Sequence, residues 1–302
     1  MRLVALGTIA LDSVETPFGK VRDVLGGSVT YFSLASRFFS KCGVLGVVGV
    51  DFPEEHLRML ESHGIDLSGV EISEGKTFKW EGYYEYDMNH AHTVRTELNV
   101  LASFKPKIPK GYKGCDFLFL ANTDPEIQFD VLDKIRPKHV ICDTMNFWIQ
   151  HKKEKVGEVF GRCDMIIINE GEARQYCNTP NLIKAGRELL KNGTKRVIIK
   201  KGEHGALYFS ENCFFASPAF PLENLKDPTG AGDSFAGGTV GYLAGNGTMD
   251  DGSIKKAMVY GSVIASYVVE DFSIEGLKTL SKERIDERYG KFKEIVAFEH
   301  EY

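Results

Sequence analysis

Short apolar runs alternate with longer amphipathic segments along this 302-residue chain. Such runs are typical of strands that are buried on both faces, and the amphipathic segments between them are typical of helices that cover a parallel sheet. The pattern therefore predicts an α/β protein with a Rossmann-like, mostly parallel central sheet flanked by helices. The runs that predict its strands are Leu3–Leu6, Val44–Val50, Phe117–Leu120, Val140–Cys142, Met165–Ile168 and Val197–Lys200.

Helix signals lie between the predicted strands. Pro53-Glu54-Glu55 begins one helix with a proline and acidic residues in its first turn, and Gly64 ends it. Asp124-Pro125-Glu126 begins a second helix, and a third runs from Asn181 to Lys191 before an Asn-Gly pair. Strands and helices in this alternation indicate βαβ units.

One region departs from the alternation. From Thr77 to Tyr86 the even positions are apolar or aromatic and several odd positions are charged, which is the two-residue period of a half-exposed antiparallel strand. Thr93 to Val100 can pair with it, and Leu11 to Val21 can supply further strands. We expect a single domain spanning residues 1–302, with a small antiparallel β lid at about residues 11–22 and 76–101. The alternative is an edge hairpin with no functional role.

A run of small residues carries the most specific chemistry in the sequence. It reads Asp-Pro-Thr-Gly-Ala-Gly-Asp and ends at Asp233, and a helix of small and apolar residues is predicted from Phe235 to Ala244. Unpaired N–H groups and the positive end of the helix dipole bind anions at a helix N-terminus. A carboxylate beside a bound phosphate can accept a proton from an attacking hydroxyl group, so Asp233 is the candidate base. The candidate anion-binding N–H groups are those of Gly230, Ala231 and Gly232.

Competing glycine motifs do not occur in the sequence. No Gly-Lys pair has the other residues of a Walker A loop, position 235 is Phe where a GxGxxG motif needs Gly, and there is no GxSxG elbow. These observations argue against P-loop, dinucleotide-dependent oxidoreductase and serine hydrolase chemistry. From the residues alone, a tight strand–helix turn with Asp233 as a cap stays an equal alternative.

The stretch DPTGAGDSFAGG, from Asp227 to Gly238, resembles the C-terminal signature of the PfkB, or ribokinase-like, carbohydrate kinase family, D-T-x-[GA]-A-G-D-x-F. It departs from that pattern at Pro228, where Thr is common. Other family-like motifs occur in the expected order over nearly the whole chain. They are Gly26-Gly27 with Cys42–Asp51 for the N-terminal signature, Asn169 and Glu172 for N-x-x-E, and Lys201, Gly202 and Gly205 for K-G-x-x-G.

The resemblance implies a ribokinase-like fold and an ATP-dependent phosphotransferase that acts on an alcohol group (EC 2.7.1), with Mg²⁺ as cofactor. It makes Asp233 the catalytic base and the backbone of residues 230–232 the anion hole. It assigns ATP and its phosphates to the two later motifs and to Thr229, and it has Glu172 orient Mg²⁺ through water. Asp227 lies where some family members bind a monovalent cation such as K⁺. Asn169 and Glu172 can alternatively be plain helix-capping residues.

The resemblance also implies the acceptor side of the site. Asp12 matches the family residue that accepts hydrogen bonds from substrate hydroxyls, and Gly26, Gly27 and Asn146 match substrate-side positions. Tyr31 stands where many members have an Asn that contacts a sugar, and a ring offers stacking area in place of an amide. The implied acceptor is a small sugar, with a nucleoside of the adenosine or cytidine type as the alternative. A sugar or nucleotide sensor without activity is a more remote alternative.

Composition narrows the partners and the compartment. A net charge of −5 provides no general basic field for nucleic acid or an anionic membrane surface. The six cysteines are scattered without metal-ligand spacing, which favours reduced thiols. No apolar stretch approaches the ~20 residues of a membrane span, so we expect a cytoplasmic protein. Aromatic residues on the predicted lid can form its own small core or a homodimer contact.

Overall fold

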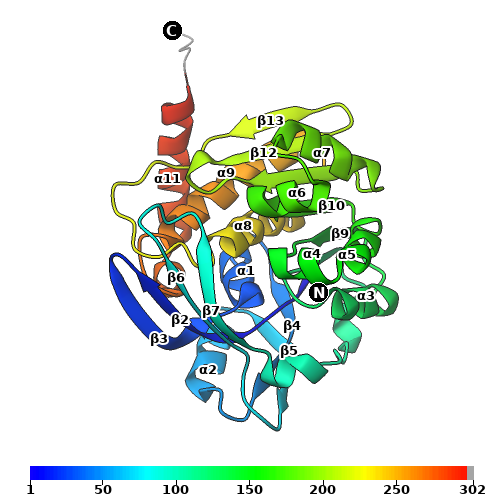
Figure 1. Cartoon of the computed structure of the whole chain (residues 1–302), viewed down its shortest axis with the longest axis vertical. Coiled ribbons are helices and arrows are strands. Elements are labelled where there is room, and N and C mark those ends of the chain that lie inside the picture. Colours follow the sequence, from blue (N-terminus) through cyan, green and yellow to red (C-terminus); the bar gives the residue numbers. More distant parts are fainter. Residues whose placement is uncertain (298–302) are drawn as a thin grey trace.

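The computed structural model describes residues 1–297 and contains two sheets (Figure 1). The larger is a nine-stranded sheet with the order β13-β12-β11-β10-β9-β8-β1-β4-β5. Its strands are β1 (Leu3–Leu6), β4 (Cys42–Gly49), β5 (Asp66–Ser73), β8 (Phe117–Leu120), β9 (His139–Cys142), β10 (Met165–Asn169), β11 (Arg196–Lys200), β12 (Ala206–Ser210) and β13 (Phe214–Ser217). The six runs predicted as buried strands are all strands of this sheet.

The larger sheet is parallel from β5 to β11 and antiparallel at β12 and β13. Parallel neighbours need crossover connections, and the helices supply them. The sequence analysis did not identify β5, β12 or β13. β5 and β13 are the edge strands of the sheet, and β12 lies next to β13. Polar residues interrupt the apolar pattern of β5, where Asp66–Ser73 has one buried position, whereas β12 and β13 are short apolar runs.

Helices cover both faces of the larger sheet (Figure 1). Successive residues of β1 face opposite sides, so Leu3 and Ala5 join one hydrophobic core and Val4 and Leu6 join the other. On the first face lie α1 (Ser28–Ser36), α2 (Glu54–Ser62), α8 (Ala231–Asn246), α9 (Asp251–Val268), α10 (Glu275–Lys278) and α11 (Lys282–Val296). On the second lie α3 (Pro125–Lys134), α4 (Asn146–His151), α5 (Lys153–Phe160), α6 (Glu170–Cys177) and α7 (Leu182–Lys191).

The helix of small residues begins earlier than the sequence predicts. It was expected from Phe235, but α8 begins at Ala231 after Gly230, which has φ 77° and ψ −2°. This left-handed conformation suits glycine and turns the chain abruptly into the helix. Asp233 therefore lies in the first turn of α8 and not in the preceding loop. The three other predicted helices are α2, α3 and α7.

A second, four-stranded sheet with the order β3-β2-β6-β7 forms the predicted lid. Its hairpins β2–β3 and β6–β7 are antiparallel, and the two hairpins join through a parallel contact between β2 and β6. The strands are β2 (Ala10–Thr16), β3 (Gly19–Gly26), β6 (Lys79–Tyr84) and β7 (Ala91–Glu97). Within residues 1–297, no helix combines the length and the apolar character that crossing a membrane requires.

Candidate active site

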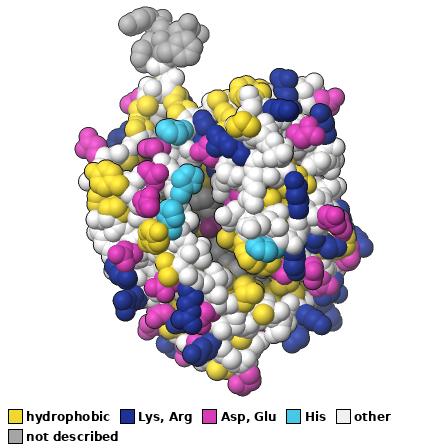
Figure 2. All heavy atoms as spheres, viewed as in Figure 1, with side chains coloured by type: hydrophobic (Ala, Val, Ile, Leu, Met, Phe, Trp, Pro, Cys, Tyr) yellow, Lys and Arg dark blue, Asp and Glu magenta, His cyan; other side chains and the backbone are white. Residues whose placement is uncertain are grey.

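The polar candidates gather where the central strands of the larger sheet end. Asn169 and Lys200 are the last residues of β10 and β11 and pair in register, and Asp143 follows β9 directly. Because parallel strands end at one edge of a sheet, these side chains face one region, toward which the first turn of α8 points. Figure 2 shows the molecule hollowed between the lid and helices α4 and α6, in the same region.

The N-terminus of α8 has the geometry of an anion site. The N–H groups of Gly230 and Gly232 have no hydrogen-bond partner within the described part of the chain, whereas the N–H of Ala231 donates to the Pro228 carbonyl at 3.1 Å. Two of the three predicted donors are thus free. A helix N-terminus with free N–H groups binds phosphate oxygens.

Asp233 stands beside these donors and is poised to titrate near neutral pH. Desolvation raises its pKa from 3.8 to about 7, with Asp143 raising it further and Lys200 opposing the rise. A base with a pKa near the operating pH combines an adequate ionised fraction with real proton affinity. The position and the pKa of Asp233 both suit the role of a general base.

Asp12 approaches the same place from the lid. It lies on β2, and its carboxylate packs so closely on Gly26 that a Cβ there would be 1.9 Å from Oδ2. Desolvation raises its pKa to about 7, the Gly27 N–H lowers it, and Asp227 and Asp233 raise it. Residues more than 200 positions apart in sequence therefore share one electrostatic environment. Asp12 is available as an acceptor for substrate hydroxyl groups.

Tyr31 is buried under the turn at the start of α8. It is 2% exposed, and a Cβ on Gly230 would lie 2.4 Å from its ring. Its ring therefore supports the turn and has little free face for stacking on a substrate, which differs from the role that its sequence position implied. The lid aromatics also pack locally: Trp80 donates to Thr93, and Tyr83 stacks on His92 at 4.8 Å.

Asn169 and Glu172 form a reciprocal capping box at the start of α6. The Glu172 N–H donates to Oδ1 of Asn169, and the Asn169 N–H donates to Oε2 of Glu172, both at 2.8 Å. Glu172 is buried, and desolvation with Asp143 nearby raises its pKa to about 8, against the effect of Lys200. Asn169 and Glu172 therefore cap the helix, as the alternative interpretation of the sequence proposed. Glu172 also lies close enough to Lys200 and Asp233 for their charges to affect its pKa.

The K-G-x-x-G motif forms the tight turn between β11 and β12. Gly202 and Gly205 have φ values of 55° and 82°, and the Lys201 N–H donates to the Gly205 carbonyl at 2.7 Å. The tip of the β6–β7 hairpin reaches this turn, because the Asn89 amide donates to Glu203 at 3.1 Å. The lid therefore touches the loop to which the nucleotide was assigned.

Thr229, held by Asp227, connects the turn before α8 to the lid. The Thr229 hydroxyl lies 3.3 Å from the Tyr84 hydroxyl of β6, and the backbone N–H of Thr229 donates to Asp227 at 2.9 Å.

Asn146 differs from the other candidates: it is exposed at the start of α4, and its Oδ1 accepts the Phe147 N–H at 2.9 Å. Within residues 1–297, Asn146 makes no hydrogen bond or ion pair with Asp233 or Asp12.

Sequence reasoning missed Lys200 and Asp143. The Lys200 ammonium donates to Oδ2 of Asp143 at 2.7 Å, and the two side chains are only 15% and 4% exposed. Lys200 ends the apolar strand β11 and Asp143 directly follows the apolar strand β9. This position at the end of a buried strand was the sequence signal that could have identified them. A strand-end lysine is more often solvated, so its burial depends on the neighbouring strands and α8.

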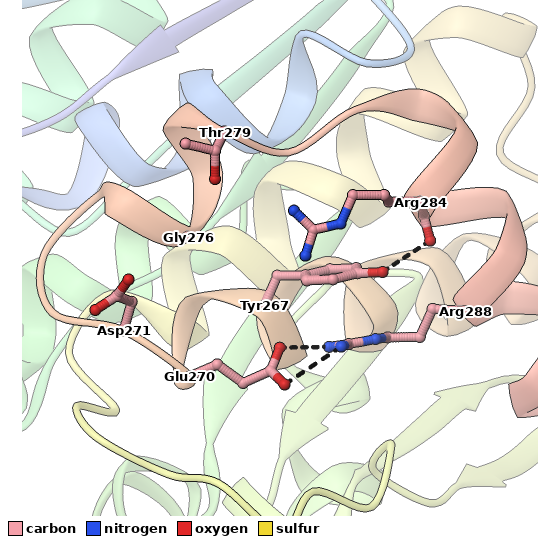
Figure 3. A pocket seen from close by; sticks show the side chains of 7 residues that line it. All are labelled: Tyr267, Glu270, Asp271, Gly276, Thr279, Arg284 and Arg288. Atoms are coloured by element: carbon pink, nitrogen blue, oxygen red, sulfur yellow. Dashed lines mark hydrogen bonds and ion pairs between the residues drawn. The ribbon is translucent and has the colours of Figure 1, made fainter.

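A separate hollow of about 220 Å³ lies among the C-terminal helices (Figure 3). The Tyr267 ring lies between the guanidinium groups of Arg284 and Arg288, at 4.8 and 3.5 Å from the ring centre. Arg288 is already engaged by both carboxylate oxygens of Glu270. This arrangement ties α9 to α11 and involves none of the candidate catalytic residues.

The comparisons with known proteins agree with the geometry. The sequence profile of the pfkB family carbohydrate kinases matches residues 19–276. The chain belongs to the pfkB family of carbohydrate kinases. The match includes the capping box, the β11–β12 turn and the α8 turn, although Asp12 precedes it. Members of this family are phosphotransferases, so the protein is a kinase.

Individual relatives span nearly the whole of this kinase. A cytidine kinase from Thermococcus kodakarensis is 31% identical over 250 residues, covering 80% of this chain and 87% of the relative. The structure of the Methanocaldococcus jannaschii nucleoside kinase superposes with a TM-score of 0.76 at 20% identity, covering 96% of this chain and 99% of that chain. A candidate ribokinase II from E. coli, solved with ATP and Mg²⁺, has a TM-score of 0.77 at 18% identity and covers 97% and 99%.

Proposed function

We propose that this kinase transfers the γ-phosphoryl group of ATP to the hydroxymethyl group of a small sugar or a sugar-containing substrate. The observation that carries the proposal is the turn at the start of α8, where Asp233 stands beside the free N–H groups of Gly230 and Gly232. This turn offers a proton acceptor and an anion site within one helical turn. Phosphoryl transfer needs both, together with accurate positioning.

In the proposed reaction Asp12 holds a hydroxyl of the acceptor and directs its hydroxymethyl group toward Asp233. Asp233 accepts the alcohol proton as the new O–P bond forms, and the bond between the γ-phosphorus and the bridging oxygen breaks with its electron pair left on ADP. The N–H groups of Gly230 and Gly232 stabilise the charge on the transferring group. The lid contacts through Tyr84 and Asn89 support closure over the acceptor, which limits transfer to water.

The residues present fit Mg²⁺ held mainly by phosphates and water. Within residues 1–297, no group of three His, Cys, Asp or Glu side chains is arranged to bind a metal ion directly. Glu172 uses Oε2 for the capping box, and Oε1 has no hydrogen-bond partner among the described residues. The charges of Asp143 and Lys200 both act on this carboxyl group. Mg²⁺, when bound, would neutralise phosphate charge, and Glu172 would orient its water ligands.

Glu172→Gln tests this assignment. Glutamine can still accept the Asn169 N–H, so the fold should persist, but the charge that orients the hydrated ion is lost. We expect the Mg²⁺ concentration at half-maximal rate to rise about tenfold and kcat to fall about 10–100-fold, with ATP affinity little changed. Glu170→Gln is the matched control, because Glu170 lies in the same helical turn and pairs with Arg174. Identical Mg²⁺ titrations for both variants would limit Glu172 to helix capping.

A monovalent cation near Asp227 is part of the proposal. Asp227 is 1% exposed, and the groups that donate to its carboxylate are backbone N–H groups of Thr229 and Ser273, at 2.9 and 3.4 Å. Within the described residues no cationic side chain pairs with it. A buried carboxylate without a cation is costly, and K⁺ would offset that cost. Rates measured in K⁺ and in tetramethylammonium salts would test the dependence.

A nucleoside is the second candidate acceptor. It is favoured by the relative at 31% identity, which is a cytidine kinase. The ribose of a nucleoside carries the same hydroxymethyl group, so the chemistry at Asp233 is unchanged. Tyr31 is buried against Gly230, so its ring does not support the stacking of a base.

The decisive experiment measures ADP release from ATP across a panel of free sugars and nucleosides. We expect acceptor-dependent release with at least one member, and product analysis should find a phosphate ester on the hydroxymethyl oxygen. Selective turnover of cytidine or another nucleoside would establish the second candidate. No acceptor-dependent release across the panel, with ATP bound, would favour a sensor without activity.

We further propose a homodimer through the lid and a cytoplasmic location. Tyr83 and Val94 are 40% and 62% exposed and line a hollow of about 510 Å³ on the lid, and Phe18 in the β2–β3 turn is 55% exposed. Exposed apolar groups that gather on one element are typical of an interface. Sedimentation would give the mass in solution.

The proposed cytoplasmic location is supported by the use of ATP, which the cytoplasm supplies, and by the six cysteines, none of which forms a disulfide within the described part of the chain.

A further inference from the structure

Three neighbouring strand ends converge on one buried ammonium group. Asp143 follows β9, Glu172 lies one turn beyond the end of β10, and Lys200 closes β11. Asn169 and Lys200 are paired in the sheet, so β10 and β11 end at the same height. The side chains that follow these strands therefore meet at the C-terminal edge of the sheet. Lys200 is the cation that faces the carboxylates of Asp143, Glu172 and Asp233 there.

The position of Lys200 relates it to the anion site. A Cβ added to Gly232 would lie 3.2 Å from its Nζ, so the ammonium stands against the first turn of α8. One of its three N–H donors is taken by Asp143 at 2.7 Å, and the described residues supply no second hydrogen-bond acceptor to it. Asp143 is itself fixed, because its Oδ1 accepts the Thr144 N–H at 2.8 Å. A buried ammonium with spare donors therefore lies against Gly232, whose N–H is one of the two free backbone donors of this turn.

A purely structural ion pair is a poor explanation for this placement. Taking two charges out of water costs about as much as their attraction returns, and hydrophobic side chains of similar size often stabilise a protein more. Desolvation lowers the pKa of Lys200, but the surrounding carboxylates, first Asp143, raise it overall, so the side chain keeps its proton. The site thus maintains a permanent positive charge where a phosphoryl group would sit.

We propose that Lys200 is a catalytic residue that donates hydrogen bonds to the transferring phosphoryl group, and that Asp143 is the positioning residue that holds it there. The inference rests on the proposed function and adds a charged donor to the two backbone donors. Lys200 keeps its proton throughout, while the alcohol proton passes to Asp233 and the bridging electron pair remains on ADP. In the absence of ATP, Lys200 also favours the ionised form of Asp233.

The test compares Lys200→Met with Lys200→Arg and with the double variant Lys200→Met/Asp143→Asn. We expect Lys200→Met to lower kcat by about 10²–10³ with a much smaller change in the KM for ATP, since the contact strengthens in the transition state. The limb of the kcat/KM profile that reports Asp233 should move to higher pH by about one unit or more. Lys200→Arg should retain more activity than Lys200→Met, because it keeps the charge.

The double variant separates catalysis from folding. It removes the unpaired buried carboxylate, so its melting temperature should recover relative to Lys200→Met, while its kcat should stay low. Recovery of kcat to within threefold of the unmodified kinase would overturn the proposal, as would an unshifted pH profile. Lys195→Met is the control: Lys195 precedes the same strand at its far end and pairs on the surface with Asp164. If the unmodified kinase phosphorylates no acceptor, the proposed function fails instead.

Discussion

Replacing Asp233 with Asn is expected to lower kcat by roughly 10²–10⁴ while leaving the fold and ATP affinity largely intact. The amide has the shape of the carboxylate but cannot accept the alcohol proton. Steady-state kinetics with the best acceptor, together with ATP titration, would measure both quantities. Asp251→Asn is the control, since Asp251 is an acid in the first turn of another helix, where it accepts the Tyr208 hydroxyl.

The same variant has a stability signature with a definite sign. Burial raises the pKa of Asp233 from its ordinary value of 3.8 to about 7 in the folded protein. The folded state therefore favours the protonated acid, and this contribution to stability is complete below about pH 4 and is lost as pH rises through about 7. Asp233→Asn should thus melt at an equal or higher temperature than the unmodified kinase at pH 8, with the difference shrinking toward pH 5. Near-normal turnover by this folded variant would remove Asp233 from the role of base.

Replacing Gly230 with Ala is expected to damage both the anion site and the fold. Gly230 has φ 77°, and an added Cβ would lie 2.4 Å from the ring of Tyr31, which is buried and cannot move aside. The turn must shift, which displaces the N–H groups that stabilise the transferring phosphoryl group. Loss of such a donor costs about 10²–10³ in kcat. Kinetics and thermal melting would measure the two effects.

Gly247→Ala is the matched control for that substitution. Gly247 ends the same helix with φ 71°, and the nearest recorded atom to its added Cβ is an Arg2 nitrogen at 3.6 Å. Both variants should lose about 1–2 kcal/mol of stability from the left-handed conformation. The Gly230 variant alone should lose activity and the additional stability that the overlap with Tyr31 costs. A folded Gly230 variant with kcat within threefold of normal would show that this turn does not form the anion hole.

The sequence by itself determined the fold class, the six central strands and the strands of the small second sheet. Parallel strands that are buried on both faces consist almost entirely of apolar residues, so local sequence is enough to predict where they lie. The lid strands could also be predicted, because apolar and polar residues alternate along a half-exposed strand. The run of small residues predicted a tight turn before a helix, although α8 begins at Ala231 and not at Phe235.

Only the tertiary structure decided which polar residues meet and in what state. Asp12 lies on the lid and Asp233 on α8, yet the charge of Asp233 acts on the Asp12 carboxyl group. Burial by elements distant in sequence raises the pKa of each residue to about 7. Tyr31 looked like a substrate contact, yet its ring is enclosed by Gly230. A lysine at a strand end is more often solvated, yet the ammonium of Lys200 is buried beside Asp143 and the start of α8. Burial and charge pairing are properties of neighbours in space, which a local sequence pattern does not encode.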